Sequence, residues 1–488
     1  MYLVRCAWLF VACLAVAPSA SAQVWELASA PGFGSPLNDD FNLYVIGGDL
    51  YATAVNPNTG AEIFRYECGT IWEPLAGGTF GGDAETLLEH GGELFVSIDN
   101  PVTGVEVHRW DGTTWILDNV PGFDNNTFNA EAALYSTGQT LFAATENIVT
   151  GAEVWQRSGP TDWRQINTNG FGDSNNARVW WVEQLGTLFA VAENDFSGIE
   201  VHQHLGGSGW LQVNADGFGD QFNRECEDTP FEFNGELFVT VVRTNGCQVW
   251  RQDSIANWMP VTTDGFGNAD NLAVESHGVF QGNLYFSTFN TVTGAEVHRY
   301  DGGMNTTLVS APGFGLNTEG SKTLTEYGGL LWCGTENPLN GGEVWNWDGS
   351  PINSWAPPPF SPFPIPMNDS VDLIEFQGEL FAYGSDFVYK LTAPDTFQRG
   401  DCNGDGLTNI ADPITLLSSL FPSGPIVPVD CEDACDGNDD GMVDIADAIT
   451  ILTALFGTMT TPLPNPDQCC GPDPTLDSLT CVMSPMCP

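Results

Sequence analysis

Two twelve-residue segments near the C-terminal end carry oxygen-bearing side chains at a spacing suited to binding a metal. Residues 401–412 read DCNGDGLTNIAD and residues 436–447 read DGNDDGMVDIAD, so both match D-x-N-x-D-G-x-x-[ND]-x-x-D. Oxygen ligands at positions 1, 3, 5, 9 and 12, with a backbone carbonyl at position 7, can surround one Ca²⁺. Gly406 and Gly441 fill position 6, where glycine permits the sharp turn. The two segments therefore predict two calcium ions.

Each predicted loop precedes an apolar run (413–421 and 448–456) that predicts a short helix, capped by the last aspartate of the loop. A single match of this kind is typical of an Asx-rich turn, but two matches, each with its glycine and its helix, favour metal binding. The expected calcium ligands are Asp401, Asn403, Asp405, the Leu407 carbonyl, Asn409 and Asp412 in the first loop and Asp436, Asn438, Asp440, the Met442 carbonyl, Asp444 and Asp447 in the second.

This duplicated loop and helix, with aspartate at position 12, resembles the type I dockerin family over residues 400–457. The resemblance implies a non-catalytic anchoring module that calcium folds and that binds a cohesin domain, in the context of polysaccharide degradation. The sequence places Ile-Ala at 410–411 and 445–446, where cohesin-recognising members usually have a Ser/Thr pair. The expected partner is therefore a cohesin-like protein or another surface protein. Cys402, Cys431 and Cys435 suggest a disulfide between the two repeats.

The N-terminal end predicts export. Arg5, the apolar run CAWLFVACLAVA and Ala20-Ser21-Ala22 form a signal peptide over residues 1–22. The run is too short to span a bilayer, and no later stretch is long enough. We therefore expect a soluble protein that is secreted, extracellular or on the cell surface, with no membrane span. We divide the rest into a propeller (23–395), the dockerin-like module (396–460) and a Cys/Pro-rich tail (461–488).

Residues 23–395 consist of a repeated unit of about 47 residues, in which short aromatic and β-branched runs alternate with Gly/Asn/Asp clusters. The chain starts with a Trp-containing strand that no inner strands precede, and the repeats end at 370–391 with inner strands only. The first strand can therefore complete the last sheet and close a ring, which removes exposed sheet edges. In seven copies a Phe follows a Trp by eight residues, and an eighth copy keeps Phe314 with Thr306 in place of Trp: Trp25/Phe33, Trp72/Phe80, Trp115/Phe123, Trp163/Phe171, Trp210/Phe218, Trp258/Phe266 and Trp355/Phe363.

The fold class that follows is an all-β propeller of eight four-stranded blades, with seven blades as the alternative, followed by a small α-helical dockerin-like calcium-binding domain. In a propeller, the loops between second and third strands and the blade-to-blade loops emerge on one face. Here these are the N-x-x-x-G loops, such as 147–151, and the D/N-GFG-D/N loops, such as 169–173. Because longer polar connections tend to carry function, we expect any protein or glycan to bind on this long-loop face.

Several residue types recur once per blade and are therefore better explained as scaffold than as chemistry. A Glu recurs in the third strand, and it could either ring a cation or sugar site or bond backbone groups at its own blade seam; repetition favours the second interpretation. His108, His202 and His298 alternate with Trp and therefore fill volume. Trp180 and Trp181 lie outside the pattern and are the better candidates for exposure. The recurring carboxylates and their amide counterpart are Glu62, Glu106, Glu153, Glu200, Glu296, Glu343 and Gln248.

The charge restricts the partners. With 63 Asp+Glu against 13 Lys+Arg, the formal charge is -50, which repels nucleic acid and anionic membranes. We expect a secreted calcium-binding platform rather than an enzyme. The alternatives are a glycoside hydrolase or polysaccharide lyase carried by the propeller and a structural cell-surface protein. No catalytic residue can be named, since no hydrolase or metalloprotease motif occurs. The irregular fifth copy (Arg224–Cys247) is the strongest deviation, and a Cys226–Cys247 disulfide would staple it.

Overall fold

The structure is a computed structural model of the 488-residue chain. The predicted signal peptide and most of the predicted tail lie outside the residues it describes. No helix in the described part is long and apolar enough to cross a membrane. The described residues are 24–75, 80–254, 257–315, 318, 320–350, 354–357, 363, 370–384, 387–392, 397–421, 429, 431–457, 462–466, 470–471, 479 and 481.

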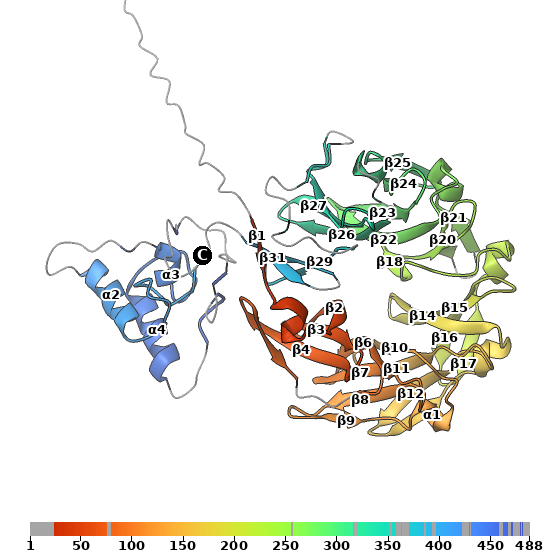
Figure 1. Cartoon of the computed structure of the whole chain (residues 1–488), viewed down its shortest axis with the longest axis horizontal. Helices are drawn as coiled ribbons and strands as arrows, with labels where there is room; N and C mark the ends of the chain where they lie inside the picture. Colours follow the sequence, from red (N-terminus) through yellow and green to blue (C-terminus); the bar gives the residue numbers. More distant parts are fainter. Residues whose placement is uncertain are drawn as a thin grey trace, which may run out of the picture.

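Eight antiparallel sheets form a ring around a central axis (Figure 1), and in seven of them the strands follow one another in the chain. In blade 7 the sheet has three strands, and an isolated bridge between Asn346 and Ala356 stands where the fourth would be. The strands of blades 1 to 4 are β2 (Asp39–Ile46), β3 (Asp49–Asn56), β4 (Gly60–Cys68), β5 (Ile71–Pro74), β6 (Asp83–His90), β7 (Glu93–Asp99), β8 (Glu106–Trp110), β9 (Trp115–Leu117), β10 (Ala132–Ser136), β11 (Leu141–Thr145), β12 (Val154–Gly159), β13 (Asp162–Gln165), β14 (Asn176–Gln184), β15 (Thr187–Asn194), β16 (Glu200–Gly206) and β17 (Gly209–Gln212).

The ring closes through its first strand. β1 (Val24–Leu27) pairs with β31 (Val388–Thr392), with Trp25 opposite Leu391, so that the N-terminal strand completes blade 8. Both predictions, eight blades and closure by offset ends, are confirmed, and the seven-blade alternative is excluded. The strands of blades 5 to 8 are β18 (Phe231–Phe233), β19 (Glu236–Val241), β20 (Gln248–Ser254), β21 (Asn257–Pro260), β22 (Ala273–Phe280), β23 (Asn283–Phe289), β24 (Val297–Gly302), β25 (Asn305–Leu308), β26 (Gly320–Tyr327), β27 (Leu330–Glu336), β28 (Val344–Trp347), β29 (Asp372–Phe376), β30 (Glu379–Tyr383) and β31 (Val388–Thr392).

Each GFG turn inserts its Phe against the next blade. Phe171 adopts a left-handed backbone (φ 57°) and stacks on His202 at 4.1 Å between ring centroids, as Phe218 stacks on Trp250 at 4.8 Å. His202 and Trp250 thus occupy equivalent positions, which confirms that these histidines fill space. The five GFG turns are 3-10 helices, and the equivalent turn with Asp124 in place of the second glycine is a single helical turn, α1: η1 (Pro31–Gly34), α1 (Gly122–Asn125), η2 (Asn169–Gly172), η3 (Asp216–Gly219), η4 (Asp264–Gly267) and η5 (Pro312–Gly315).

The glycine of each N-x-x-x-G loop permits a close backbone approach to a GFG turn. A Cβ atom at Gly151 would lie 2.7 Å from the Cα of Gly170, which is closer than any side chain tolerates. The outer-strand tryptophans add a second link between blades. The indole Nε1 of Trp163 donates to the Asp118 carbonyl at 2.7 Å, and that of Trp210 donates to the Ile166 carbonyl at 3.0 Å. Glycines and tryptophans therefore recur because they join neighbouring blades.

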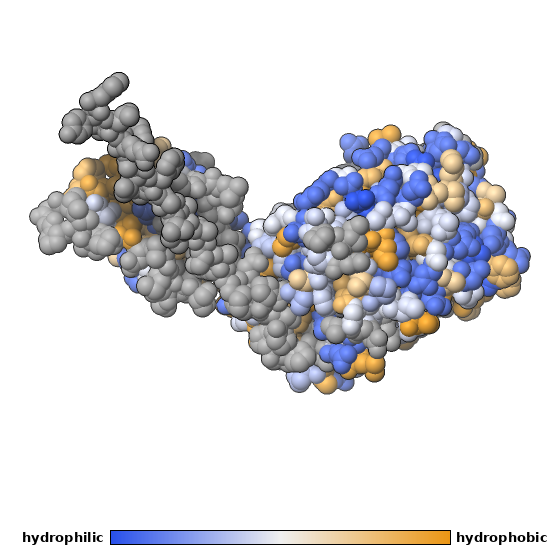
Figure 2. All heavy atoms as spheres, turned by 90° about the horizontal axis from the view of Figure 1, so that it is seen from above, coloured by the Kyte–Doolittle hydropathy of each residue, from blue (hydrophilic) through white to orange (hydrophobic). Residues whose placement is uncertain are grey.

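The C-terminal helices form a separate small core outside the ring (Figure 1). α2 (Ala411–Leu420) contacts α4 (Ile445–Phe456), and α3 (Glu432–Cys435) is a single turn. The Cys402–Cys435 disulfide lies within this core and joins the two repeats, as predicted. A second disulfide joins Cys431 to Cys481. Hydrophobic side chains reach the surface of this region beside the atoms drawn in grey (Figure 2).

Candidate functional site

The first strands of the blades line the central channel. Consecutive first strands contact one another around the ring, for example β6 with β10 and β22 with β26. Each first strand begins at the end where the second strand stops, as the pairing of Asp83 with Asp99 shows for blade 2. This end also carries the N-x-x-x-G loops, so it belongs to the long-loop face. Side chains near these strand starts surround the mouth of the channel.

Carboxylates dominate this mouth. Oxygens of Glu85, Asp99 and Glu131 lie within 4.8 Å of one another, although the residues come from β6, from β7 and from the position just before β10. Partial burial and the neighbouring charge of Glu131 raise the pKa of Glu85 to about 7, although part of this side chain stays exposed to solvent. Burial and Glu131 also raise the pKa of Asp99. The closeness of these acids means that protonation or a cationic group relieves their repulsion.

Two basic side chains enter the acidic mouth. Arg178 pairs with Glu131 and lies 3.3 Å from Glu146. On the other side of the ring the Lys322 ammonium lies 2.8 Å from both Glu275 and Glu336. Burial alone would lower the pKa of Lys322, but the two glutamates raise it above its ordinary value. Both cations are thus held by carboxylates, and the rest of the mouth keeps its negative charge.

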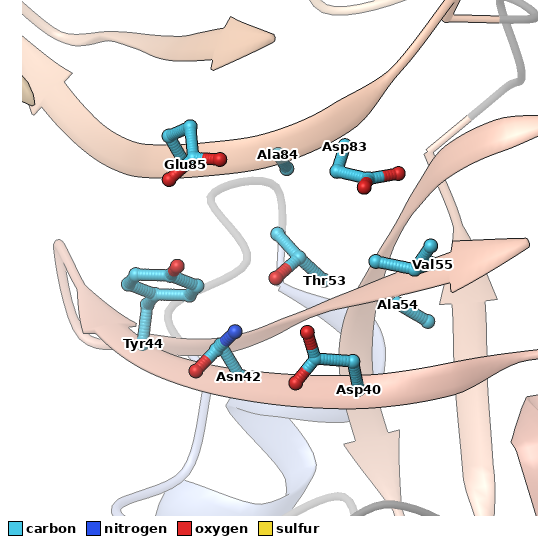
Figure 3. A pocket seen from close by; sticks show the side chains of 9 residues that line it. All are labelled: Asp40, Asn42, Tyr44, Thr53, Ala54, Val55, Asp83, Ala84 and Glu85. Atoms are coloured by element: carbon cyan, nitrogen blue, oxygen red, sulfur yellow. The ribbon is translucent and has the colours of Figure 1, made fainter. Parts of the chain in front are cut away.

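Among the described residues, cavities at three places open at the mouth. The first, of about 200 Å³, lies between blades 1 and 2, where Asp40 faces Asp83 and Glu85 across β2 and β6 (Figure 3). The second, also about 200 Å³, is lined by Glu85, Glu131 and Trp180. The third, of about 280 Å³, lies between blades 3, 4 and 5. Because Glu85 lines two of them, the cavities form an arc around one side of the channel.

The recurring third-strand glutamates take no part in this mouth. Glu153 accepts hydrogen bonds from the side-chain amide of Asn129 at 2.8 Å and from the indole of Trp155 at 3.2 Å. Glu200 accepts likewise from Asn176 at 2.9 Å. The scaffold interpretation is confirmed, but the prediction of backbone donors was wrong for these residues. An asparagine from the preceding blade-to-blade loop reaches the carboxylate because that loop returns to the blade seam.

The irregular fifth repeat (Arg224–Cys247) contains no disulfide between its two cysteines. Cys226 and Cys247 are both free and buried, so the predicted disulfide between them was wrong. Cys226 packs in the core shared with blade 4 and Cys247 in the core shared with blade 6, on opposite sides of the blade 5 sheet. Burial raises the pKa of both thiols, which keeps them protonated. The exposure expected of Trp181 was also wrong, since it is 8% exposed.

The two C-terminal loops adopt the same turn around their first and last aspartates. Asp401 accepts hydrogen bonds from the backbone N–H groups of Asp405 (3.0 Å) and Gly406 (2.8 Å). Asp412 accepts from those of Asn403 (3.1 Å) and Asn409 (2.7 Å). The second loop repeats these four hydrogen bonds, each within 0.2 Å of its counterpart in the first loop. The backbone N–H groups of Asp440 and Gly441 donate to Asp436, and those of Asn438 and Asp444 donate to Asp447.

Each loop therefore buries two carboxylates that form no ion pair with the basic residues the structure describes. The Arg399 guanidinium does reach the second loop, where it donates to the Asp436 main-chain carbonyl at 2.6 Å and pairs with Asp439 at 2.9 Å. Asp401, Asp412, Asp436 and Asp447 are at most 2% exposed. Burial raises the pKa of Asp412, and burial together with Asp436 raises that of Asp447 to about 6. No Lys, Arg or His follows Arg399 in the sequence. Clustered hard oxygens of this kind suit Ca²⁺, which would offset their repulsion. The twelve-ligand assignment stays a prediction.

Comparison with known proteins gives only distant structural likenesses. No known protein family matches the chain, and no curated protein matches it. Similar solved structures include a prolyl endopeptidase, at 10% identity and a TM-score of 0.45, covering 75% of this chain and 56% of the other. A polysaccharide lyase matches at 11% identity and 0.38, covering 65% and 91%. A puromycin hydrolase matches at 10% and 0.40, covering 73% and 60%.

The chain thus spans little more than half of the endopeptidase, and likeness at this level carries no argument about activity. The acidic mouth is the feature that the sequence pattern did not identify. One signal was available, because the sequence has only two lysines, at 322 and 390, and Lys322 opens a first strand. A rare basic residue that breaks the repeat indicates a position where neighbouring carboxylates need a positive charge.

Proposed function

We propose that this is an exported, calcium-binding platform protein. The C-terminal module, through two bound Ca²⁺ ions, anchors the chain to a partner protein, and the long-loop face of the propeller binds a protein or a glycan. One observation carries the proposal: two loops of matching geometry each bury a pair of aspartates whose carboxylates have no ion-pair partner among the described residues. Ca²⁺ supplies the positive charge there and takes oxygens from the ligand set predicted for Asp401–Asp412 and Asp436–Asp447.

The polysaccharide context rests on the dockerin-like sequence pattern. The exposed apolar side chains of the module support an anchoring role, because they occur at equivalent positions of the two repeats. Ile410 and Ile445 are 52% and 51% exposed, and Ile414 and Ile449 are 57% and 58% exposed. Exposed apolar positions that repeat in this way are typical of an interaction surface.

The test separates the module from the propeller in the intact mature chain. All tryptophans lie at or before Trp355, so tryptophan fluorescence reports on the propeller alone, whereas calorimetry detects both regions. We expect calcium to raise the temperature of the module's calorimetric transition. The corresponding gain in unfolding free energy is about 2.7 kcal/mol per site when free calcium is at a hundredfold excess over Kd. The fluorescence melt should stay in place. A module transition that is the same in calcium and in EDTA would refute the calcium assignment. In the variant Asp412→Ala/Asp447→Ala, which lacks the last ligand of each loop, calcium should no longer shift the transition.

A glycosidase is the second candidate, favoured by the raised pKa of Glu85 beside two further carboxylates. Such a group can hold a proton near neutral pH and donate it, while a neighbouring carboxylate stays charged. Incubating the chain with neutral and acidic polysaccharides and assaying new reducing ends tests this function. Turnover that Glu85→Gln abolishes would establish that the chain is an enzyme. The absence of turnover would favour the binding-platform function.

A further inference from the structure

The tips of five long-loop connections carry exposed apolar residues. In each N-x-x-x-G loop of blades 2, 3, 4, 6 and 7 the third residue is aliphatic or aromatic. The exposed fractions of these side chains run from 52% to 79%, and the same kind of side chain recurs at the same loop position in five blades. We call these side chains, together with Ile148, the apolar crown: Val102, Ile148, Val149, Phe196, Val292 and Leu339.

The loop geometry does not require these side chains. The backbone N–H of Phe196 donates to the Asn194 side chain at 2.9 Å, and that of Val292 donates to Asn290 at 2.9 Å. Any residue except proline can supply that N–H group. The asparagine and the glycine are explained by the turn, whereas the apolar side chain at the tip is not. Because these side chains are more than half exposed, they are accessible to a partner.

The crown borders the acidic mouth directly. Ile148, which is 77% exposed, lines the 280 Å³ cavity together with Glu146, Glu193 and Glu227. Asp195, the neighbour of Phe196 in its loop, lines the same cavity. Apolar side chains thus stand at the rim of a negatively charged hollow, and one ligand could touch both.

The carboxylates of this cavity exceed its basic groups. Arg178 is the one cation among the lining residues, and it already pairs with Glu131 and Glu146. Within the described part of the chain, the carboxylates of Asp195, Glu225 and Glu227 have no hydrogen-bond or ion-pair partner. Their charge is left for a ligand to neutralise.

We propose that the crown and the mouth together dock a basic polypeptide. A Lys or Arg side chain enters the cavity between blades 3, 4 and 5, and flanking apolar side chains cover the crown. Charge complementarity selects this occupant. A second copy of a chain with a formal charge of -50 would be repelled. A neutral glycan would cover the carboxylates without offering a counter-charge. The inference rests on the proposed platform role of the propeller and names its partner class.

The experiment is a selection from a phage-displayed library of random linear peptides, with the full mature chain as bait. The enriched sequences should combine Lys or Arg with apolar residues, and their binding should weaken as salt rises from about 50 to about 500 mM. Phe196→Ser/Ile148→Ser should weaken the best synthesised peptide about tenfold or more. Glu225→Gln/Glu227→Gln should weaken it and flatten its salt dependence.

Matched controls lie on the opposite face, in the hairpins of blades 4 and 3. Leu185→Ser removes a side chain that is 81% exposed, and Asp162→Asn removes an exposed carboxylate; neither should change binding. Enriched peptides without net positive charge, no enrichment, or peptides that bind all variants alike would overturn the proposal. So would binding of a neutral oligosaccharide that Phe196→Ser/Ile148→Ser abolishes, although the platform role would then survive. A failed calcium titration, by contrast, would count against the proposed function only.

Discussion

The propeller and the C-terminal module are both built from repeats that carry acidic side chains, but they treat those side chains differently. In the propeller, Glu153 is 6% exposed and receives hydrogen bonds from asparagine and tryptophan side chains. In the module, Asp401 and Asp412 are equally buried, and backbone N–H groups of their own loop are the donors that reach them. Both regions repeat an acidic residue, but the groups that donate hydrogen bonds to its carboxylate differ between them.

This difference shows how a repeated polar residue can be interpreted. Where neighbouring blades donate the hydrogen bonds, the carboxylate completes the fold and needs nothing further. Where two buried carboxylates face each other without a cation, protonation or a bound ion relieves their repulsion. The recurrence of Glu153 and its counterparts therefore marks scaffold, and the recurrence of Asp412 and Asp447 marks the proposed calcium loops.

The largest expected effect tests whether the two regions unfold independently. Cys402→Ala/Cys435→Ala removes the crosslink between the repeats, whose cysteines are 33 residues apart. A loop of that length predicts a loss of about 3–4 kcal/mol in the unfolding free energy of the module, measured by calorimetry at fixed calcium. The tryptophan-fluorescence melt should not change. If both transitions shifted together, the regions would form one cooperative unit.

The next effect concerns the scaffold role of the recurring carboxylates. Blade 3 pairs Glu153 with the Asn169 amide at 3.0 Å, and blade 5 reverses this pair, with Gln248 donating to Asp264 at 2.6 Å. Gln248→Glu alone would place two carboxylates in contact and should destabilise the propeller by about 2 kcal/mol. Adding Asp264→Asn restores the blade 3 arrangement.

Urea unfolding followed by tryptophan fluorescence measures both variants. The double variant should recover most of the stability lost by Gln248→Glu, because the acid and amide are then exchanged as a pair. Two losses that simply add would show that the carboxylate acts on something other than its amide partner. The scaffold interpretation would then fail in this blade.

A smaller effect concerns pH. Burial and Glu131 raise the pKa of Glu85 from about 4.5 to about 7, so between these values the folded state holds a proton that the unfolded state has lost. The unfolding free energy should therefore fall as pH rises through this window. The contribution is about 1 kcal/mol, because solvent at the mouth screens the charge. Glu85→Gln should reduce the slope between pH 5 and 7, measured by urea unfolding, and an unchanged slope would contradict the shift.

The sequence predicted the ring better than the mouth, and the reason is physical. The number of blades follows from Trp–Phe spacing, since Trp163 and its counterparts make the same contact in successive blades. The offset of β1 from the other strands gave the closure. The side-chain donors to Glu200 were also within reach of the sequence, because Asn176 precedes it by 24 residues, as Asn129 precedes Glu153.

The mouth could not be predicted in this way. Glu85, Glu131 and Arg178 come from three blades and meet only because the first strands converge on the channel. Their relation depends on the radius of the ring and on where each strand starts, and no local spacing encodes either quantity. The Cys226–Cys247 disulfide failed for a similar reason, since closeness in the sequence did not reveal that the two thiols lie on opposite sides of a sheet.

The smallest effect isolates one link between blades. Trp163 donates its indole N–H to the Asp118 carbonyl at 2.7 Å, whereas the N–H of Trp115 has no partner among the residues that the structure describes. Trp163→Phe and Trp115→Phe remove similar volumes, but only the first leaves a carbonyl without its donor. Trp163→Phe should therefore cost roughly 0.5–1 kcal/mol more in the unfolding free energy, measured by urea unfolding with the remaining tryptophans as the probe. Equal losses would mean that the tryptophans recur for their bulk, and the propeller repeats would then be defined by packing rather than by hydrogen bonds between blades.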